Sequence, residues 1–401
     1  MQTSTVSKHT QDLLELTDPV RQFITRSTHS RRIGDPGICD FVFGNPQEMP
    51  LPEFSQALIH AAVPQNKDWF AYTMSLPSAR QVIAETLKRL HELPYRPEDI
   101  FMTSGAFGAL YVSLGALVDP GDEVIFISPP WFFYEAMIVA HHGVPVRVRC
   151  DAATHDLDIE AIANAISPRT RAIIVNTPNN PTGRIYPPET LRGLADLLTT
   201  ASQSYGRPIF ILADESYNRI IYSDCEFYSP AVYYPYTLVI YTYGKTLLSP
   251  GQRIGYIALP PSLGEDEQLR DAIFITQVVS GWAFPNALLQ RALPELETLS
   301  ISIPRLEMRR DKMVEALRSM GYELNSPEGT FYILVRSPLA DEMEFTRLLE
   351  EQEIFCLPGS VFEMPGYFRI SLTASDEMVE KALPGFEKAI LEARSYSIPT
   401  R

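Results

Sequence analysis

The amino-acid sequence predicts an α/β fold with two domains: a large domain whose mostly parallel mixed sheet is flanked by helices, and a smaller α+β domain built from the N- and C-terminal segments. Between residues 99 and 258, short apolar runs alternate with helical segments, which is typical of a mostly parallel sheet. The apolar runs hold few polar residues, as expected for strands buried on both faces. With 401 residues, the chain is also longer than a typical single domain.

The expected elements follow in chain order from the periodicity of apolar residues and from turn signals. Before residue 99 we expect a helix at 12–25, an exposed connection at 26–37, a short strand entering a turn at 41–46, and a helix at 78–92. In the alternating region we expect strands at 99–103, 123–127, 144–148, 172–175, 209–213, 238–241 and 253–258, and helices at 106–118, 133–141, 158–166 and 188–198. Near the C-terminus we expect a helix at 304–320, strands at 332–335 and 368–372, and a helix at 377–393. These elements predict an N-terminal segment (1–50) that joins the small domain, a large domain (51–298) and a small C-terminal domain (299–401).

Composition excludes several classes of protein. The net charge of −15 argues against a nucleic-acid-binding protein, which needs a basic face. No apolar run reaches the roughly 18 residues of a membrane helix, and the N-terminal region lacks the apolar core of a secretory signal. The four cysteines are scattered, and no Cys or His cluster has metal-ligand spacing. We therefore expect a cytoplasmic globular enzyme without a metal site.

Unusual residues follow five of the expected strands, at the edge where open α/β sheets bind ligands. Gly105, Ala106 and Phe107 lie in a stretch of mostly small residues between a strand and a helix. Their backbone N–H groups would suit a phosphate, and a plain strand–helix turn is the alternative. Trp131 follows the next strand, where an aromatic side chain can stack on a planar ring or simply pack.

The segment 176–183 (Asn-Thr-Pro-Asn-Asn-Pro-Thr-Gly) is the most specific local motif, because two prolines and a glycine fix a rigid loop. In that loop Asn180 can be held as a donor to a phenolate oxygen. Asp214 ends an apolar strand, where a carboxylate is costly unless a group such as a pyridinium nitrogen pairs with it. An ordinary helix N-cap is an equally good explanation of Asp214 alone. Tyr217, three residues later, could reach the phenolate oxygen of the same ring.

Lys245 lies in a tight glycine-containing segment after an apolar strand, where desolvation would lower its pKa and make it nucleophilic. A surface lysine is the alternative. The Thr242 hydroxyl and the Arg253 guanidinium would be partners for a phosphate. The order and spacing of all these groups point to one ligand, a phosphorylated pyridine aldehyde. The residues that would converge on it are Asn180, Asp214, Tyr217, Lys245 and Arg253.

From about Phe41 to the C-terminus the sequence resembles the class I/II aminotransferases, enzymes of fold type I that depend on pyridoxal 5′-phosphate (PLP). The motifs that carry the resemblance are Ser104-Gly105-Ala106, Asn179-Asn180-Pro181-Thr182-Gly183, Asp214-Glu215-Ser216-Tyr217, Lys245 with Arg253 eight residues on, and Phe368-Arg369-Ile370-Ser371.

The resemblance implies catalytic roles for three residues. Lys245 would hold PLP as a Schiff base and later move the proton, Asp214 would pair with the pyridine nitrogen, and Tyr217 would hydrogen-bond the phenolic oxygen. Other residues would contact the cofactor through its phenolic oxygen, its ring face or its phosphate: Asn180, Trp131, Gly105, Ala106, Phe107, Thr242 and Arg253.

The resemblance also implies a substrate site and a partner. Arg369 would clamp the substrate α-carboxylate with its bidentate fork, and Gly44 and Asn180 would help to bind the substrate. Members of the family are usually homodimers, in which a tyrosine of the partner contacts the phosphate. Tyr72 is the candidate for that tyrosine, although the spacing differs from the family pattern.

The implied reaction moves an amino group between an α-amino acid and a 2-oxo acid with ping-pong kinetics. A β- or γ-eliminating lyase, a carbon–carbon-forming synthase, a decarboxylase or an oxidase would share every motif, because the cofactor carries the chemistry. The substrate side chain is not readable from these motifs. Arg26, Arg31 and Arg32 could meet an acidic side chain, but a solvated surface is the simpler explanation.

Overall fold

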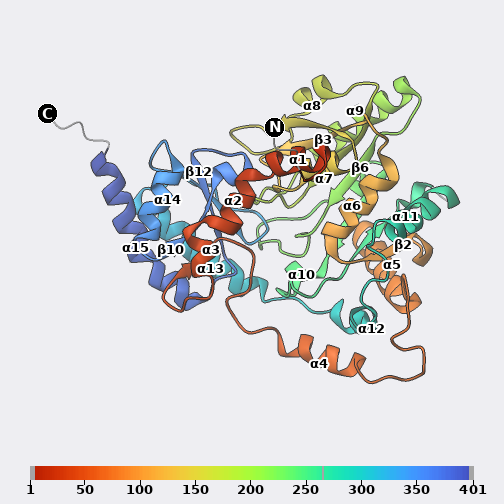
Figure 1. Cartoon of the computed structure of the whole chain (residues 1–401), viewed down its shortest axis with the longest axis horizontal. Helices are drawn as coiled ribbons and strands as arrows, with labels where there is room; N and C mark the ends of the chain where they lie inside the picture. The colour runs from red at the N-terminus through yellow and green to blue at the C-terminus, as the bar shows by residue number, and fades with distance from the viewer. Residues whose placement is uncertain (1–4, 264–265, 397–401) are drawn as a thin grey trace.

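The computed structural model describes residues 5–263 and 266–396. Its centre is a seven-stranded sheet in the order β2-β8-β7-β6-β5-β3-β4. Strands β2, β3 and β6 of this sheet are labelled in Figure 1. The strands are β2 (Ile100–Thr103), β3 (Glu123–Ser128), β4 (Val144–Arg149), β5 (Thr170–Asn176), β6 (Phe210–Asp214), β7 (Thr237–Thr242) and β8 (Gly255–Ala258). Strands β3 to β7 pair in parallel, and β8 is antiparallel to both of its neighbours. The predicted mixed, mostly parallel sheet is confirmed.

Helices cover both faces of the sheet, because successive side chains of a buried strand point to opposite sides. On one face, apolar side chains pack against α6 (Gly105–Leu117), α7 (Tyr134–Ala140) and α11 (Glu267–Val279). The other face carries two clusters. One involves α8 (Ile159–Ala165) and α9 (Pro188–Tyr205), and the other α4 (Pro52–Ala61), α5 (Pro77–His91) and α12 (Ala287–Leu296).

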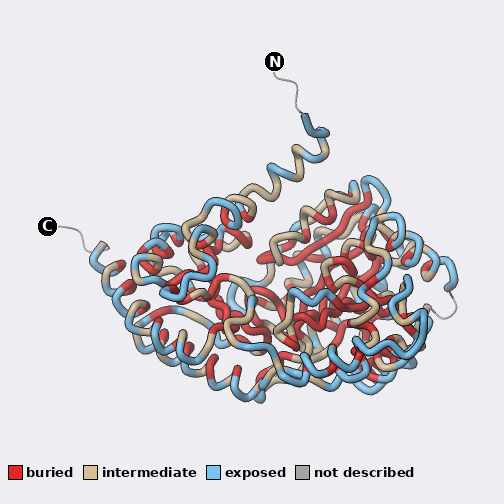
Figure 2. The backbone as a smooth tube through the Cα atoms, turned by 60° about the horizontal axis from the view of Figure 1, so that its bottom comes forward, coloured by how far each residue is buried: buried red, intermediate tan, exposed pale blue. Residues whose placement is uncertain are grey.

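A second core is built from the C-terminal region with help from the N-terminal segment. Its three-stranded sheet has the order β11-β12-β9. The elements are β9 (Tyr332–Arg336), β11 (Leu357–Pro358), β12 (Tyr367–Ser371), α13 (Ile303–Met320), α14 (Glu342–Glu350) and α15 (Asp376–Tyr396). The short strand β1 (Cys39–Asp40) pairs in parallel with β10 (Ile354–Phe355), which ties the N-terminal segment to this core. Buried residues are concentrated in the two cores (Figure 2). We propose that the domains meet near residues 50 and 298.

The N-terminal 50 residues differ most from the expectation. The single helix expected at 12–25 is two helices, α1 (Lys8–Leu16) and α2 (Asp18–Arg26). Pro19 explains the break, because it lacks a backbone N–H group and suits only the first turn of a helix. The connection at 26–37 contains α3 (Thr28–Arg32), in which His29 is buried. At 41–46 we expected a short strand entering a turn: the strand was wrong, since β1 ends at Asp40, but the chain does bend at 42–44.

Other departures have local causes. Strand β4 was expected to be buried on both faces, but it is the last strand of the sheet and exposes Val144. Helices α4, α11, α12 and α14 were not predicted. No helix within the described residues is both long and apolar enough to cross a bilayer. The four cysteines are free, and residues 5–263 and 266–396 hold no group of three His, Cys, Asp or Glu that could bind a metal.

Gly255 shows how tightly β8 is fitted beside the start of α6. A Cβ atom at Gly255 would lie 2.3 Å from the carbonyl oxygen of Tyr241 and 2.9 Å from the Cα atom of Gly105. Both are backbone atoms, so they cannot move without displacing a strand or a helix. The substitution Gly255→Ala should therefore lower the free energy of unfolding by about 3 kcal/mol, as measured by urea denaturation.

Gly251, four residues earlier, provides the matched control. A Cβ atom there meets nothing within 4 Å, so Gly251→Ala should change the free energy of unfolding by less than about 0.5 kcal/mol. Equal effects of the two substitutions would contradict the close packing of β8.

Candidate active site

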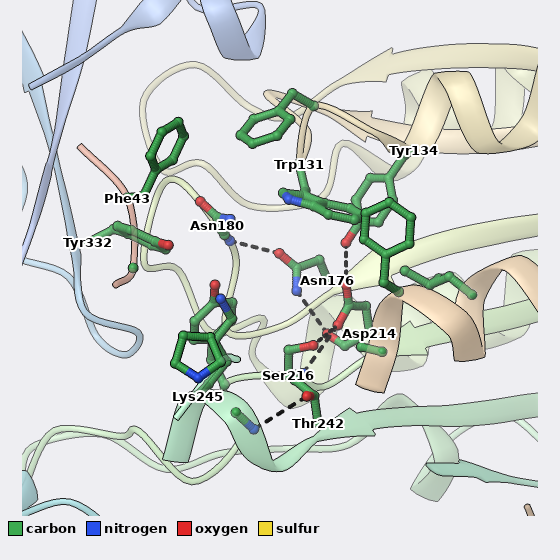
Figure 3. A pocket seen from close by; sticks show the side chains of 18 of the residues that line it. Phe43, Trp131, Tyr134, Asn176, Asn180, Asp214, Ser216, Thr242, Lys245 and Tyr332 are labelled. Atoms are coloured by element: carbon green, nitrogen blue, oxygen red, sulfur yellow. Dashed lines mark hydrogen bonds between the residues drawn. The ribbon is translucent and has the colours of Figure 1, made fainter. Parts of the chain in front are cut away.

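The ends of five strands surround one cavity between the two cores (Figure 3). Most of the residues predicted from the sequence line it: Gly44, Ala106, Phe107, Trp131, Asn180, Asp214, Tyr217, Thr242, Lys245, Arg253 and Arg369. Gly105 lies directly behind this lining, against Arg253. Tyr72 is not among the lining residues. Its side chain is 87% exposed, and its ring lies 4.8 Å from that of Phe284.

Asp214 is a buried carboxylate held by two hydroxyl groups. Its oxygens accept hydrogen bonds from Tyr134 Oη at 2.6 Å and from Ser216 Oγ at 2.5 Å. Burial raises the pKa of Asp214, and these two hydrogen bonds oppose that rise. Within the described part of the chain Asp214 forms no ion pair. A carboxylate so fixed suits a cationic ring nitrogen.

Lys245 lies in the short helix α10 (Tyr243–Thr246), directly after β7. Its Nζ atom is 5.7 Å from the ring centroid of Tyr217 and 5.8 Å from that of Phe331. Tyr217 is buried and donates its hydroxyl hydrogen bond to Tyr332, and burial raises the pKa of Tyr217. The amine of Lys245 therefore projects into the cavity beside aromatic rings (Figure 3).

One end of the cavity is suited to an anion. Helix α6 begins at Gly105 with φ +81° and has no side-chain cap, so its first backbone N–H groups are open to a ligand. A Cβ atom at Gly105 would lie 2.9 Å from Arg253 Nη2 and 3.3 Å from Thr242 Oγ1. Only glycine lets these two side chains approach the helix start. Burial lowers the pKa of Arg253.

The other end holds a second guanidinium group, Arg369, which is 2% exposed. Its Nη1 donates to Asn180 Oδ1 at 2.8 Å and its Nη2 to the carbonyl oxygen of Val42 at 3.0 Å. The guanidinium carbon lies 3.9 Å from the ring centroid of Tyr332. Its Nε has no hydrogen-bond partner among the described residues, and burial lowers the pKa of Arg369. A buried cation with only neutral partners suits an anionic ligand.

Four residues that shape the site were not singled out from the sequence: Tyr134, Asn176, Ser216 and Tyr332. Asn176 ends β5 and donates from Nδ2 to the carbonyl oxygen of Asp214 at 2.9 Å. Asn176 and Ser216 lie within predicted motifs, so their positions carried a signal. Tyr134 is 80 residues from Asp214, and no local pattern indicates that contact.

The model of the family described as "Aminotransferase class I and II" matches residues 37–386 of this chain. The chain belongs to this family. A relative from Thermus aquaticus named probable aspartate/prephenate aminotransferase is 32% identical over 349 residues, covering 86% of this chain and 89% of the relative. An aspartate/prephenate aminotransferase from Thermus thermophilus is 32% identical over 351 residues, covering 86% and 89%. Members of the family use PLP, and the chain is an enzyme, a transaminase.

Solved structures agree with the fold. An aminotransferase from Eubacterium rectale has a TM-score of 0.85 and 29% identity, and the match covers 98% of this chain and 99% of that one. The aspartate aminotransferase from Thermus thermophilus, solved with maleate, has a TM-score of 0.80 and 28% identity, with coverage of 96% and 100%. The α/β fold predicted from the sequence is thereby confirmed as the fold of the family.

Glu215 is a second buried carboxylate directly after Asp214. It accepts hydrogen bonds from Ser229 Oγ and from Asn218 Nδ2, and His91 Nε2 lies 3.8 Å from it. Burial raises the pKa of Glu215 to about 7. Burial also lowers the pKa of His91 to about 4, so this imidazole is neutral above that pH. The raised pKa of Glu215 means that the folded state holds a proton that the unfolded state releases.

Protein stability should therefore fall as the pH rises from about 4.5 through 7, because ionised Glu215 is destabilised only in the folded state. The shift corresponds to about 3 kcal/mol. Glu215→Gln removes the contribution of Glu215 to this dependence, and Asn218 Oδ1, which lacks a partner in the described structure, can accept from the new amide. The variant should gain stability relative to the wild type between pH 5 and pH 8, measured by urea denaturation.

The exposed Glu315 on α13 provides the control. Glu315→Gln should leave the pH dependence of unfolding unchanged. If Glu215→Gln behaves in the same way as Glu315→Gln, burial of Glu215 does not set the pH dependence.

Proposed function

We propose that this transaminase binds PLP in the cavity, with the cofactor attached to Lys245. The observation that carries the proposal is that Lys245 lines the same cavity as a buried carboxylate, Asp214, and as an end suited to an anion, which α6, Thr242 and Arg253 form. PLP has the matching groups: an aldehyde, a basic ring nitrogen and a phosphate. When its ring nitrogen is protonated, PLP supplies an electron sink for the α-carbon of an amino acid.

The residues around the ring would each do one task. Asp214 would keep the proton on the ring nitrogen, while Tyr134 and Ser216 hold the carboxylate in place. Asn180 offers its Nδ2 to the phenolic oxygen, because its Oδ1 is taken by Arg369. The hydroxyl of Tyr217 would donate a hydrogen bond to the same oxygen. Trp131 lines the cavity and would cover one ring face, and edge-on packing against Phe107, with centroids 5.1 Å apart, holds its indole in place.

The substrate would be held at the opposite end. Arg369 would bind the α-carboxylate, with the unpartnered Nε among its donors. Gly44 would present its backbone to the substrate, and its lack of a side chain lets this segment pack on the Phe331 ring, from which a Cβ atom would be only 2.7 Å away. Once released from the cofactor, the amine of Lys245 would remove the proton from the α-carbon as a general base. These roles account for transfer of an amino group in two half-reactions.

We further propose a homodimer and a cytoplasmic location. Tyr72 and Phe284 contact each other and are 87% and 49% exposed, and Val279 nearby in sequence is 74% exposed. An apolar patch of this kind fits contact with a second copy of the chain, and Tyr72 would then be the residue offered to the partner's phosphate site. The four free cysteines fit a reducing compartment.

Borohydride reduction followed by peptide mass spectrometry tests the attachment. In the purified holoenzyme, reduction should abolish the visible absorbance of the bound cofactor and leave a pyridoxyl group on the peptide that contains Lys245. Lys245→Ala should keep the fold but carry no covalent cofactor. Lys388→Ala, which removes an exposed lysine of α15, should behave as the wild type. Modification of a different lysine would contradict the proposal.

A further inference from the structure

The cavity contains few cations, and the proposed function already uses each of them. Among the described residues that line it, the lysines and arginines are Lys245, Arg253 and Arg369. Lys245 is the attachment point, and Arg253 lies at the phosphate end beside Gly105. Arg369 lies at the other end, on Asn180 and Val42. Within the described lining, no cation is left for a second carboxylate of a substrate.

Aromatic side chains lie where the substrate side chain would go. Phe43 directly follows Val42, whose carbonyl oxygen accepts from Arg369, and it lines the cavity together with Phe132. Figure 3 shows Phe43 and Tyr332 on one side of the cavity and Trp131 on the other. A substrate's side chain and its α-carboxylate share one carbon atom. A side chain next to the α-carboxylate at Arg369 therefore meets aromatic rings.

The rings at the cavity mouth belong to a larger apolar cluster. Phe43 and Phe132 both pack against buried residues of α2 and of the C-terminal core, including Val20, Phe355 and Phe362. This packing holds the rings in place on their outer side. The mouth is therefore a preformed apolar surface.

Other arginines near the site do not add a positive charge to the cavity lining. Arg147 lies behind Phe132 in a neighbouring cavity, where it pairs with Glu135 at 2.6 Å and with Glu363 at 2.7 Å. The N-terminal arginines at 26, 31 and 32, which the sequence left as candidates for an acidic side chain, do not line the cavity. Arg32 pairs with Asp35 and Glu353 instead.

The surface proposed to meet a second copy has cations beside Tyr72, where Lys67 is exposed and Arg291 stacks on Trp69, but its other part, around Trp282 and Phe284, has none. Trp282 lies 6.4 Å, between ring centroids, from Phe107, which lines the cavity. Between Arg270 and Arg291 the sequence has no lysine or arginine. A partner that presents this segment would add apolar side chains such as Val279 and Phe284, and no positive charge.

We propose that the amino acid selected by this cavity has a large apolar or aromatic side chain, and that a dicarboxylic acid binds more weakly. The inference rests on the proposed function, since it assumes that Arg369 binds the α-carboxylate. Burial of an aromatic side chain against the rings is favourable. A second carboxylate would lose its hydration without gaining a cation.

Equilibrium binding of unreactive acids to the holoenzyme tests this directly. The probes are 3-phenylpropionate and succinate, which lack the amino group and cannot react, and the dissociation constants are measured by calorimetry. Wild-type enzyme should bind 3-phenylpropionate at least ten-fold more tightly than succinate. Equal or tighter binding of succinate would overturn the inference, and so would failure of both acids to bind.

Phe132→Ala separates contact with the ligand from general stability. It should weaken binding of 3-phenylpropionate at least ten-fold and leave binding of propionate within two-fold. Tyr205→Ala, which removes a partly exposed ring at the end of α9, should change neither constant. Parallel loss of propionate and 3-phenylpropionate binding in Phe132→Ala would mean that the ring acts only through the fold, and would overturn its role in selection.

The visible absorbance of the cofactor, recorded on the same samples, keeps the two proposals apart. If the cofactor is bound through Lys245 but succinate is preferred, the proposed function stands and the inference on the side chain fails. If no cofactor is held, the proposed function itself fails.

Discussion

The carboxylate of Asp214 is the constraint on which the rest of the site depends. An unpaired carboxylate in a protein interior costs several kcal/mol, and hydrogen bonds to hydroxyl groups offset part of that cost. Tyr134 and Ser216 supply those hydrogen bonds, and a cationic ring nitrogen would supply the missing charge. The register of the sheet sets its position, because Asp214 lies beside Asn176 of β5 and Ile240 of β7. The segments that follow β5 and β7 carry Asn180 and Lys245, so one register brings the three groups together.

Arg369 performs a similar task between the two cores. It sits on the central strand of the C-terminal sheet, between Leu357 of β11 and Leu334 of β9. Its guanidinium group contacts Asn180 from the large unit and Val42 from the N-terminal segment. The cation therefore couples three separate parts of the chain at the place where an anionic substrate would bind.

The fold and the principal residues of the site could be predicted because strong local patterns carry them. A change from apolar to small, polar or charged residues marks the end of each strand. The carboxyl ends of parallel strands necessarily meet at one edge of the sheet. The N-terminal segment could not be predicted in the same way. Its helices break at Pro19, and its short strand forms only by pairing with Ile354 and Phe355 more than 300 residues away. Tyr134 also depends on tertiary contact, since its role follows from the distance to Asp214.

The departure at residues 41–46 has the largest consequence for function. A strand there would have turned alternate side chains away from the cavity. Instead the chain bends after Asp40, which aims the carbonyl group of Val42 at Arg369 and lines the cavity with Phe43. The sequence indicated a turn in this segment, but it did not indicate that the bend begins directly after Asp40 and places Phe43 at the cavity.

A half-reaction without an acceptor tests the central claim most directly. The purified holoenzyme is mixed with one amino acid at a time, and the 2-oxo acid released is measured against the concentration of subunits. We expect a single burst of about one 2-oxo acid per subunit for an accepted amino acid, followed by arrest until a second 2-oxo acid is added, as in a ping-pong cycle. Continuous release of product without an acceptor, or no release with any amino acid from an enzyme that carries its cofactor, would contradict it.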